Sequence, residues 1–385
     1  MTFQVSRKEG FDLRKLYLGK AKRVVVKVGS AVLTGDNGLD LAVMENLARE
    51  ISFLIKSGKE VLLVSSGAVA AGRKRLGLET QRKLGLKEKQ AAAAVGQSRL
   101  MRFYEDIFDR QGYKVAQVLL THDDLSNRNR YLNVRNTILT LLEWKIIPIL
   151  NENDTVSVEE LRFGDNDTLG SLITNLIEAD LFICLTDVDG LYTGNPHRDP
   201  EAKPVYTVAK VDKNIEAMAG HVVGALGTGG MQSKIQAARM VSLRGGSSFI
   251  GSGRRQAILQ QLFAGEPVGT FFLPQSEKLQ SRKHWIAYVL RPKGHIVLDQ
   301  GACKAIVKSG KSLLPSGILE VRGNFGVGAP VQCLDESGAA IATGLSNYSA
   351  ADLAKIKGLN TGEIEKAIGY KDSDEVIHRD NLVVL

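Results

Sequence analysis

A glycine-rich stretch that ends in a lysine, GTGGMQSK at residues 227–234, has the composition of an anion-binding loop. Three of its first four residues are glycines, and Lys234 stands at the start of a helix-like run. Glycines let backbone amides approach a ligand closely, and the first turn of a helix attracts negative charge. The spacing matches neither the GxxxxGK[ST] loop nor the GxGxxG loop. On spacing alone, a phosphate cradle and a simple glycine turn are equally supported.

Two further motifs place polar groups directly after apolar runs. In KVGS, residues 27–30, Lys27 lies at the end of an apolar run, and a Gly-Ser turn with exposed amides follows. In SSGAVAAG, residues 65–72, Ser65 and Ser66 precede a helix of small residues, whose first amides could hold an anion. The alternatives are a solvated lysine and ordinary N-capping by serine. The adjacent turn favours a function for Lys27, whereas the serines support both interpretations equally.

The segment NENDTVSVEELRFGDNDTLG, residues 151–170, contains six acidic residues and one arginine. It follows an apolar run and is expected to form a hairpin loop. Its carboxylates suit the ammonium group of an amino acid, and its amides suit the carboxylates of that substrate. The alternative is an acidic surface loop with Asx turns. The density of short polar side chains favours a binding site: Asn151, Asn153, Asp154, Asp165, Asn166 and Asp167.

A last loop, LTDVDGLYTGNP at residues 185–196, begins with Thr186 and Asp187 and suits a nucleotide or a plain turn. Taken together, the motifs place two lysines, two glycine-rich turns and an acid/amide pocket at one sheet edge. Phosphoryl transfer fits this set, because the protein's part in that reaction is mainly positioning and charge neutralisation. One lysine on each side of the phosphoryl group, with Mg²⁺ from the nucleotide, would stabilise its developing charge.

The elements that must position these groups are apolar, β-branched runs separated by longer helical patterns. The runs are continuous rather than alternating, as in strands buried on both faces. Strands alternating with helices predict an α/β fold with a mostly parallel open sheet flanked by helices, in which ligands bind beyond the carboxyl ends of the strands. The predicted strands are residues 23–28, 60–64, 113–120, 145–150, 179–185 and 247–250.

The sequence changes character near residue 274, where the helical alternation stops. Short strand-like pieces between Gly, Pro and Asn turns then predict a small β-rich domain. The expected organisation is an N-terminal extension (1–20), an α/β domain (21–275), a linker (276–284), a β-rich domain (285–370) and a C-terminal tail (371–385). The extension is expected to be a solvated helix.

The net charge of +8 is confined to residues 1–283, because residues 284–385 hold 11 Lys+Arg and 11 Asp+Glu. A neutral C-terminal domain speaks against strong nucleic-acid binding, which needs a basic footprint. Elsewhere a basic cluster either forms a solvated face or steers anionic substrates toward a cleft. Its members are Arg73, Lys74, Arg75, Arg82, Lys83, Lys87 and Lys89.

Cysteine and histidine usage indicates a cytoplasmic protein without a zinc site. Cys184, Cys303 and Cys333 are far apart, as is typical of reduced thiols, and the six histidines show no HxxxH or HExxH spacing. No apolar run approaches the roughly 20 residues that span a bilayer. The N-terminal residues lack the apolar core of a secretory signal.

Seven motifs in order, KVGS, SSGAVAAG, AAVGQSRL, NENDTV, GDND, LTDVDGLY and GTGGMQSK, resemble the amino acid kinase family over about residues 21–370. KSLLPSGILEVRGNFGVG resembles a PUA domain, an appendage of the bacterial members that phosphorylate glutamate. The resemblance implies the amino acid kinase fold followed by a PUA-like barrel. It also implies ATP-dependent phosphorylation of the L-glutamate γ-carboxylate to L-glutamyl 5-phosphate, the first step of proline biosynthesis.

The resemblance also assigns roles to residues that match the motifs. Lys27 and Lys234 would neutralise the transferring phosphoryl group, and Asp167 would orient both lysines. The residues expected to bind glutamate are Ser66, Asp154, Asn166 and Asn151. The residues expected to bind ATP are Lys27, Thr186, Asp187, Thr228, Gly229, Gly230, Met231, Gln232, Ser233 and Lys234. Ser233 stands where the family has threonine, and it keeps the hydroxyl group.

Other expectations from the resemblance concern cofactor and partners. They are Mg²⁺ that enters with ATP and has no protein cage, a homo-oligomer (dimer or tetramer), feedback inhibition by proline, and transfer of the product to glutamate-5-semialdehyde dehydrogenase. One alternative keeps the class and changes the substrate to acetylglutamate, aspartate or another small carboxylate or carbamate. Asp154, which would face the ammonium of free glutamate, discriminates between them. The other alternative is an RNA-binding protein that works through its PUA-like domain.

Overall fold

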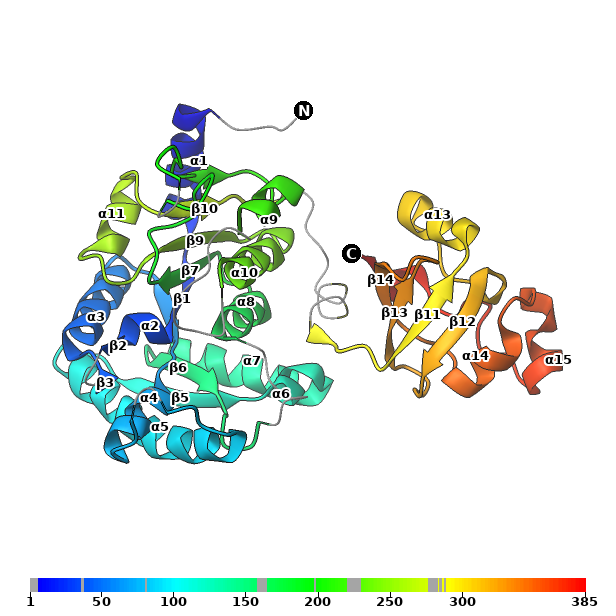
Figure 1. Ribbon diagram of the computed structural model, residues 1–385, viewed down its shortest axis with the longest axis horizontal. Helices are drawn as coiled ribbons and strands as arrows, with labels where there is room; N and C mark the ends of the chain where they lie inside the picture. The colour runs from blue at the N-terminus through cyan, green and yellow to red at the C-terminus, as the bar shows by residue number, and fades with distance from the viewer. Residues whose placement is uncertain are drawn as a thin grey trace. The chain divides into compact units, whose positions relative to one another are not determined.

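The computed structural model describes residues 6–35, 38–79, 82–157, 165–196, 199–219, 230–275, 283, 286 and 289–385. The chain divides into two compact units, Met1–Lys278 and Leu279–Leu385 (Figure 1). The division falls inside residues 276–284, the segment in which the sequence predicts a linker. No helix in these described ranges is long and apolar enough to cross a membrane.

The first unit alternates strands with helices along most of its length. Its described helices are α1 (Arg7–Lys20), α2 (Ser30–Leu33), α3 (Leu41–Lys56), α4 (Ala68–Arg75), α5 (Leu86–Asp109), α6 (His122–Ser126), α7 (Arg128–Glu143), α8 (Asn166–Leu176), α9 (Lys213–Ala219), α10 (Met231–Leu243) and α11 (Ile258–Ala264). Its described strands are β1 (Arg23–Val28), β2 (Thr34–Gly35), β3 (Gly38–Leu39), β4 (Glu60–Val64), β5 (Val115–Leu120), β6 (Ile147–Glu152), β7 (Leu181–Thr186), β8 (Thr207–Val208), β9 (Ser247–Ser252) and β10 (Thr270–Phe272).

Eight of these strands form one sheet with the order β5-β6-β4-β1-β7-β9-β10-β8 (Figure 1). All neighbouring strands in it are parallel except β9 and β10. The predicted mostly parallel sheet is confirmed, and each of the six predicted runs forms one of its strands. The sequence analysis missed β8 and β10, because strands of 2 and 3 residues are too short to show a pattern.

The central strand β1 presents alternate residues to opposite faces of the sheet. Three of its residues belong to the core that the sheet forms with α3 and α5: Val24, Val26 and Val28. Lys27 therefore lies on the other face, which α8 covers with α10 beside it (Figure 1). Gly170 permits this close packing of α8, because a Cβ there would lie 2.6 Å from the Phe182 ring.

Helix α3 shows how the apolar periodicity builds the opposite layer. Asp40 caps its N-terminus by accepting a hydrogen bond from the Val43 amide at 3.2 Å. The stripe of apolar residues packs into the core at Met44, Leu47, Ile51 and Leu54. Helical spacing in the sequence is thus enough to identify the buried face of α3.

The N-terminal extension differs from its prediction. Residues 7–20 do form a helix, but α1 packs against β8 and α11 instead of standing free in solvent. Leu18 is 2% exposed and joins the main core, and the buried Arg14 Nη2 donates to the Val268 carbonyl at 2.8 Å. The buried positions of α1 are too few to give a strong apolar stripe, so the sequence did not reveal the packing.

The second unit contains a five-stranded sheet with the order β12-β11-β13-β14-β15. Its described elements are β11 (Gly294–Leu298), α13 (Gln300–Ser309), β12 (Ile318–Gly323), β13 (Pro330–Leu334), β14 (Ala340–Leu345), α14 (Ala350–Ile356), α15 (Ile364–Ile368) and β15 (Leu382–Val384). The predicted β-rich domain is confirmed. Residues 371–385 are not a free tail, however, because β15 pairs with β14 and Ile377 forms a bridge with Leu313.

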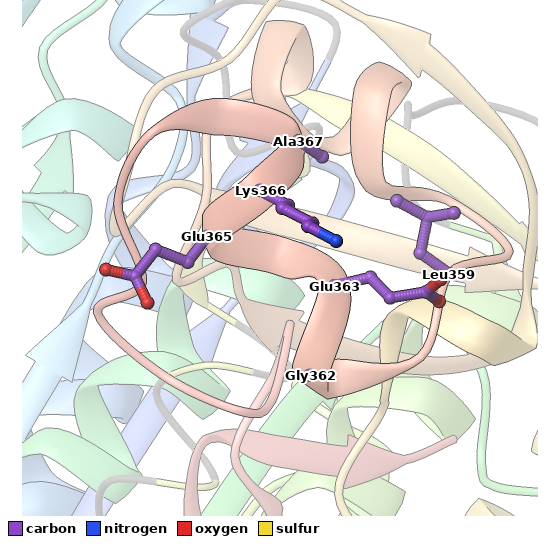
Figure 2. A pocket seen from close by; sticks show the side chains of 6 residues that line it. All are labelled: Leu359, Gly362, Glu363, Glu365, Lys366 and Ala367. Carbon is purple, nitrogen blue, oxygen red and sulfur yellow. The ribbon is translucent and has the colours of Figure 1, made fainter.

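An open hollow lies on the second unit beside α15. Figure 2 shows Lys366 and Glu363 on the same side as Leu359, whereas Glu365 points away from them. Its charged side chains are all exposed, so they keep ordinary solvent contact. The hollow is in a different unit from the lysines and carboxylates that the sequence analysis identifies as candidates.

Candidate active site

The predicted site residues gather at the carboxyl ends of neighbouring parallel strands. Strands β6, β4, β1 and β7 lie side by side and run in the same direction. Asn151 belongs to β6, Ser66 follows β4, Lys27 lies in β1 and Thr186 ends β7. The order of the strands therefore sets an order along the edge, from amide and hydroxyl groups, through a central cation, to the Thr186 loop.

Asn166 and Asp167 lie in the first turn of helix α8, so the hairpin-loop prediction is wrong for them. The Asp165 side chain caps this helix by accepting from the Thr168 amide at 2.8 Å. The acidic composition of the segment hid the apolar helical stripe that follows it. That stripe consists of Leu169, Leu172, Ile173 and Leu176, all buried.

Asp167 binds both predicted lysines. Lys27 Nζ lies 2.5 Å from Asp167 Oδ1, and Lys234 Nζ lies 3.1 Å from Asp167 Oδ2. Ser233 Oγ donates to Oδ2 at 2.8 Å, and Cys184 Sγ donates to Oδ1 at 3.2 Å. The carboxylate side chain is 0% exposed and each lysine side chain is 6% exposed. The two lysines, which come from distant parts of the sequence, therefore meet on one buried carboxylate.

Lys27 and Asp167 each hold the other in its ionised form. Burial alone would raise the pKa of Asp167, but the ammonium groups of Lys27 and Lys234 hold that pKa well below its usual range. Burial alone would lower the pKa of Lys27, but the electrostatic influence of Cys184 and then of Asp167 raises this pKa above its usual value. The cluster therefore has a formal charge of two cations against one anion, which favours an anionic ligand.

A second group, made of amides and hydroxyls, lies on the β4–β6 side of the cluster. Asn166 Nδ2 donates to the Ser65 carbonyl at 2.7 Å and lies 2.8 Å from Ser66 Oγ. It also lies 3.1 Å from Asn151 Oδ1, while the Asn151 amide donates to Gln97 Oε1 at 2.9 Å. These contacts fix the orientation of polar side chains next to the positive cluster.

The turn between β4 and α4 is shaped by neighbours of Ser66. Gly67 has φ 94°, in the left-handed region that favours glycine, and it is the N-cap residue of α4. Ser65 Oγ shares a 2.8 Å hydrogen bond with the buried Tyr104 hydroxyl of α5. The backbone therefore turns sharply and leaves Ser66 at the start of a helix, where an anion is favoured.

Asp154 lies in the turn that follows β6 and is partly buried. Two residues before it in β6, Glu152 accepts a hydrogen bond from Ser157 Oγ at 2.9 Å, which ties the two ends of this turn together. The Asn153 amide donates to the Leu120 carbonyl at 2.8 Å, so the turn is also attached to β5. The structure thus places Asp154 on the same side of the edge as Asn151.

Three of the residues predicted for ATP, Lys27, Ser233 and Lys234, belong to the cluster itself. The other described ones lie on its β7 and α10 side. Thr186 is buried at the end of β7, and its hydroxyl donates to Asp187 Oδ1 at 3.0 Å. Gly230 is the N-cap residue of α10, as the glycine-rich motif predicts, and its carbonyl lies 3.5 Å from Lys234 Nζ. Met231 and Gln232 lie in the first turn of α10, Met231 buried and Gln232 exposed. Thr228 and Gly229 fall outside the described ranges.

The sequence analysis missed three side chains that support this site. Cys184 donates to Asp167, Gln97 accepts from Asn151, and Tyr104 binds Ser65. The AAVGQSRL motif contains Gln97 and was a usable signal. Cys184 looks like one more apolar residue in a buried strand, and only the pairing of β7 with β1 shows that it lies beside Lys27.

The arrangement suits transfer of a phosphoryl group. Two ammonium groups held by one buried carboxylate present positive charge in fixed positions. The polar group with Asn166 lies on one side of that charge and the Thr186 loop on the other. An acceptor and a nucleotide bound on these two sides would meet at the lysines, so the site can position reactants and neutralise charge.

Comparison with known proteins agrees with this geometry. A model described as the amino acid kinase family matches residues 22–252, and a PUA domain model matches residues 294–368. The first match spans more than half of the chain and contains every residue of the lysine–aspartate cluster. The fold is therefore that of the amino acid kinase family.

Curated relatives narrow the family further. A glutamate 5-kinase from Desulfotalea psychrophila is 58% identical over 374 residues, covering 97% of this chain and 100% of that protein. A glutamate 5-kinase from Syntrophus aciditrophicus is 50% identical over 372 residues, covering 97% and 96%. One from Geobacter sulfurreducens is 50% identical over 374 residues, covering 97% and 100%. The chain belongs to the amino acid kinase family, in its glutamate 5-kinase branch.

Proposed function

We propose that this protein transfers the γ-phosphoryl group of ATP to the γ-carboxylate of L-glutamate. The product is L-glutamyl 5-phosphate, and the reaction is the first step of proline biosynthesis. The observation that carries the proposal is the pair Lys27 and Lys234 on Asp167, between an amide pocket and a nucleotide loop. Relatives named for this activity match the chain over almost its whole length.

In the proposed reaction an oxygen of the glutamate γ-carboxylate forms a bond to the γ-phosphorus of ATP. The bond from that phosphorus to the β–γ bridging oxygen breaks, and ADP leaves with the electron pair. Negative charge spreads over the equatorial oxygens during the transfer, and Lys27 and Lys234 stabilise it. Asp167 keeps both ammonium groups at the transfer point. No proton transfer is required, because the attacking carboxylate is already ionised.

Glutamate binding is assigned to the polar group at β4 and β6. Ser66 and Asn166 provide a hydroxyl and an amide for carboxylate oxygens, supported by the contact between Asn166 and Asn151. Asp154 supplies the negative charge for the α-ammonium group. Acetylglutamate lacks this ammonium group, so a pocket with Asp154 favours the free amino acid.

ATP binding is assigned to the opposite side, with Thr186 and Asp187 near the base and ribose. The residues from 228 to 234 would hold the phosphates, with the amides at the start of α10 as donors. Mg²⁺ would enter on the phosphate oxygens of ATP, where it adds positive charge. The ammonium groups at the transfer point agree with Mg²⁺ arriving on ATP, because ammonium groups bind phosphate oxygens and do not bind a cation.

A direct test measures ADP release with a panel of amino acids and traps the acyl phosphate with hydroxylamine. We expect glutamate hydroxamate to form only when ATP, Mg²⁺ and L-glutamate are all present. Aspartate, acetylglutamate and carbamate provide the comparison. A larger kcat/KM for any of them than for glutamate would contradict the proposed substrate.

The Asp154→Ala variant tests the assignment of the ammonium partner. We expect KM for glutamate to rise by about 10- to 100-fold, because hydrogen bonds to charged groups contribute about 1.5–3 kcal/mol. KM for ATP should change less than about twofold, because the substitution removes a contact to glutamate and leaves the ATP side unchanged. Asp187→Ala is the reciprocal control, with the larger rise expected in KM for ATP. A selective loss of ATP affinity in Asp154→Ala would count against the assignment.

The remaining expectations stay predictions of the family resemblance. They are inhibition by proline, a dimer or tetramer, delivery of the product to glutamate-5-semialdehyde dehydrogenase, and a cytoplasmic location.

A further inference from the structure

Cys184 occupies a position defined by the pairing of two central strands. In the parallel pair β1–β7, Cys184 is the register partner of Lys27. Register partners on parallel strands point to the same face of the sheet. Residues on either side of Cys184, Ile183 and Leu185, belong to the core on the opposite face. The thiol therefore lies on the Lys27 face, where α8 brings Asp167.

The contacts of Asp167 form a complete set. An ionised carboxylate has two oxygens with about four lone-pair positions in total. Oδ1 accepts from Lys27 Nζ and Cys184 Sγ, and Oδ2 accepts from Lys234 Nζ and Ser233 Oγ. Each oxygen thus has one charged donor and one neutral donor. Each carboxylate oxygen therefore shares its negative charge between one lysine and one neutral donor.

We propose that Cys184 is a positioning residue for phosphoryl transfer. Its S–H group donates to Asp167 Oδ1 and thereby weakens the ion pair between that oxygen and Lys27. The inference rests on the proposed function, since it concerns the role of Lys27 in that reaction. The ammonium group of Lys27 must exchange part of its contact with Asp167 for contact with the phosphoryl oxygens. A second donor on Oδ1 reduces the attraction between Oδ1 and Lys27, which must be partly lost when Lys27 contacts the phosphoryl oxygens.

The thiol acts here as a donor and does not act as a nucleophile. Burial and then the charge of Asp167 raise the pKa of Cys184 to about 12, so the proton stays on sulfur at neutral pH. The Cys184 side chain is 0% exposed, which closes it to solvent reagents. Its effect on the reaction is therefore transmitted through Asp167 and Lys27.

Replacing Cys184 by alanine or serine tests the hydrogen bond. We expect Cys184→Ala to lower kcat about 3- to 10-fold with both KM values within about twofold, as for loss of one weak donor acting in the transition state. Cys184→Ser keeps a hydroxyl donor and should retain kcat within about twofold of wild type. An Ala variant with full kcat, or Ala and Ser variants reduced equally, would overturn the proposal.

Cys333 offers a matched control in the second unit. It is also a fully buried cysteine on a central strand, β13. Cys333→Ala should lower the unfolding temperature to a similar extent as Cys184→Ala, because both create a cavity of the same size. Its kcat should stay at the wild-type value. A similar fall in kcat for both variants would show that lost stability explains the lower activity of Cys184→Ala, and it would overturn the proposal.

An infrared measurement tests the hydrogen bond without any activity. The S–H stretching band of Cys184 is obtained from the spectrum of the wild type minus that of Cys184→Ala. It should lie at a lower frequency than the band of Cys333, because the Cys184 S–H group donates to a carboxylate. Asp167→Asn should shift this band toward the Cys333 value. A band unaffected by Asp167→Asn would contradict the inference. Failure of the proposed function appears separately, as a wild-type protein that forms no glutamate hydroxamate.

Discussion

Lys27→Ala and Lys234→Ala are each expected to lower kcat by about 10²-fold or more, the magnitude typical for removal of one preorganised group that stabilises transition-state charge. The structure gives the reason, since each lysine provides one of the two ammonium groups on Asp167. The loss should appear in kcat and in kcat/KM for both substrates, because the charge develops only during transfer. Steady-state assays of ADP release measure it.

Lys59→Ala is the control for these variants. Lys59 lies just before β4, at the amino edge of the same sheet, and its Nζ donates to the Ala21 carbonyl at 2.7 Å. The same truncation there should leave kcat within about twofold. Circular dichroism and thermal unfolding verify that Lys27→Ala and Lys234→Ala stay folded. Near-full kcat in either lysine variant would refute the two-lysine mechanism.

Asp167→Asn is expected to destabilise the first unit by about 3–5 kcal/mol, the usual cost of removing one partner from a buried ion pair. The amide leaves two buried ammonium groups without a compensating charge. We also expect kcat to fall by about 10²-fold, because lysines displaced by about 1 Å lose their alignment with the phosphoryl group. Thermal unfolding and initial rates provide the two measurements.

The pH dependence of this stability difference follows from the direction of each pKa shift. Asp167 has a lower pKa when folded, so its contribution is complete above the ordinary carboxyl pKa and is lost as pH falls. Lys27 has a higher pKa when folded, so its contribution is complete at neutral pH and is lost only under strongly alkaline conditions. The difference between wild type and Asp167→Asn should be constant from about pH 6 to 9 and shrink below about pH 4.

Asp180→Asn serves as the control for the aspartate variant. Asp180 lies at the amino edge of the sheet and accepts hydrogen bonds from the Lys22 and Arg23 amides at 2.8 and 2.9 Å. It is exposed, so loss of its charge should cost much less than the loss at Asp167. Equal destabilisation by the two substitutions would show that the Asp167 ion pairs contribute no more to the free energy of unfolding than the exposed Asp180 does.

Local patterns in the sequence were sufficient for six strands of the large sheet, and they made the two lysines candidates. Continuous apolar, β-branched runs report burial on both faces, which identifies the parallel strands β1, β4, β6 and β7 without any tertiary information. Lys27 and Lys234 are candidates because each lies beside a glycine-containing turn, at a predicted strand end or helix start. In the structure each of these two lysines is only 5% exposed, so neither belongs to a solvated surface.

Composition predicts the wrong element where two properties compete in one segment. Asn166 and Asp167 were placed in a hairpin loop because short polar residues favour turns. The apolar residues after them instead form the buried face of α8, and Asp165 begins the helix as its cap. Similarly, the weak apolar stripe of α1 predicts a solvated helix, whereas Leu18 joins the main core in the structure.

The sequence by itself determined the class of fold, the strand runs and the types of charged and polar groups at the strand ends. The family resemblance linked Asp167 to both lysines, but only the tertiary structure showed that Lys27 and Lys234 share its two oxygens and that Cys184 completes this set. The physical reason is the range of the interactions involved. Periodicity and backbone preference act over a few residues, whereas strand order, register and helix packing depend on contacts between segments far apart in the chain.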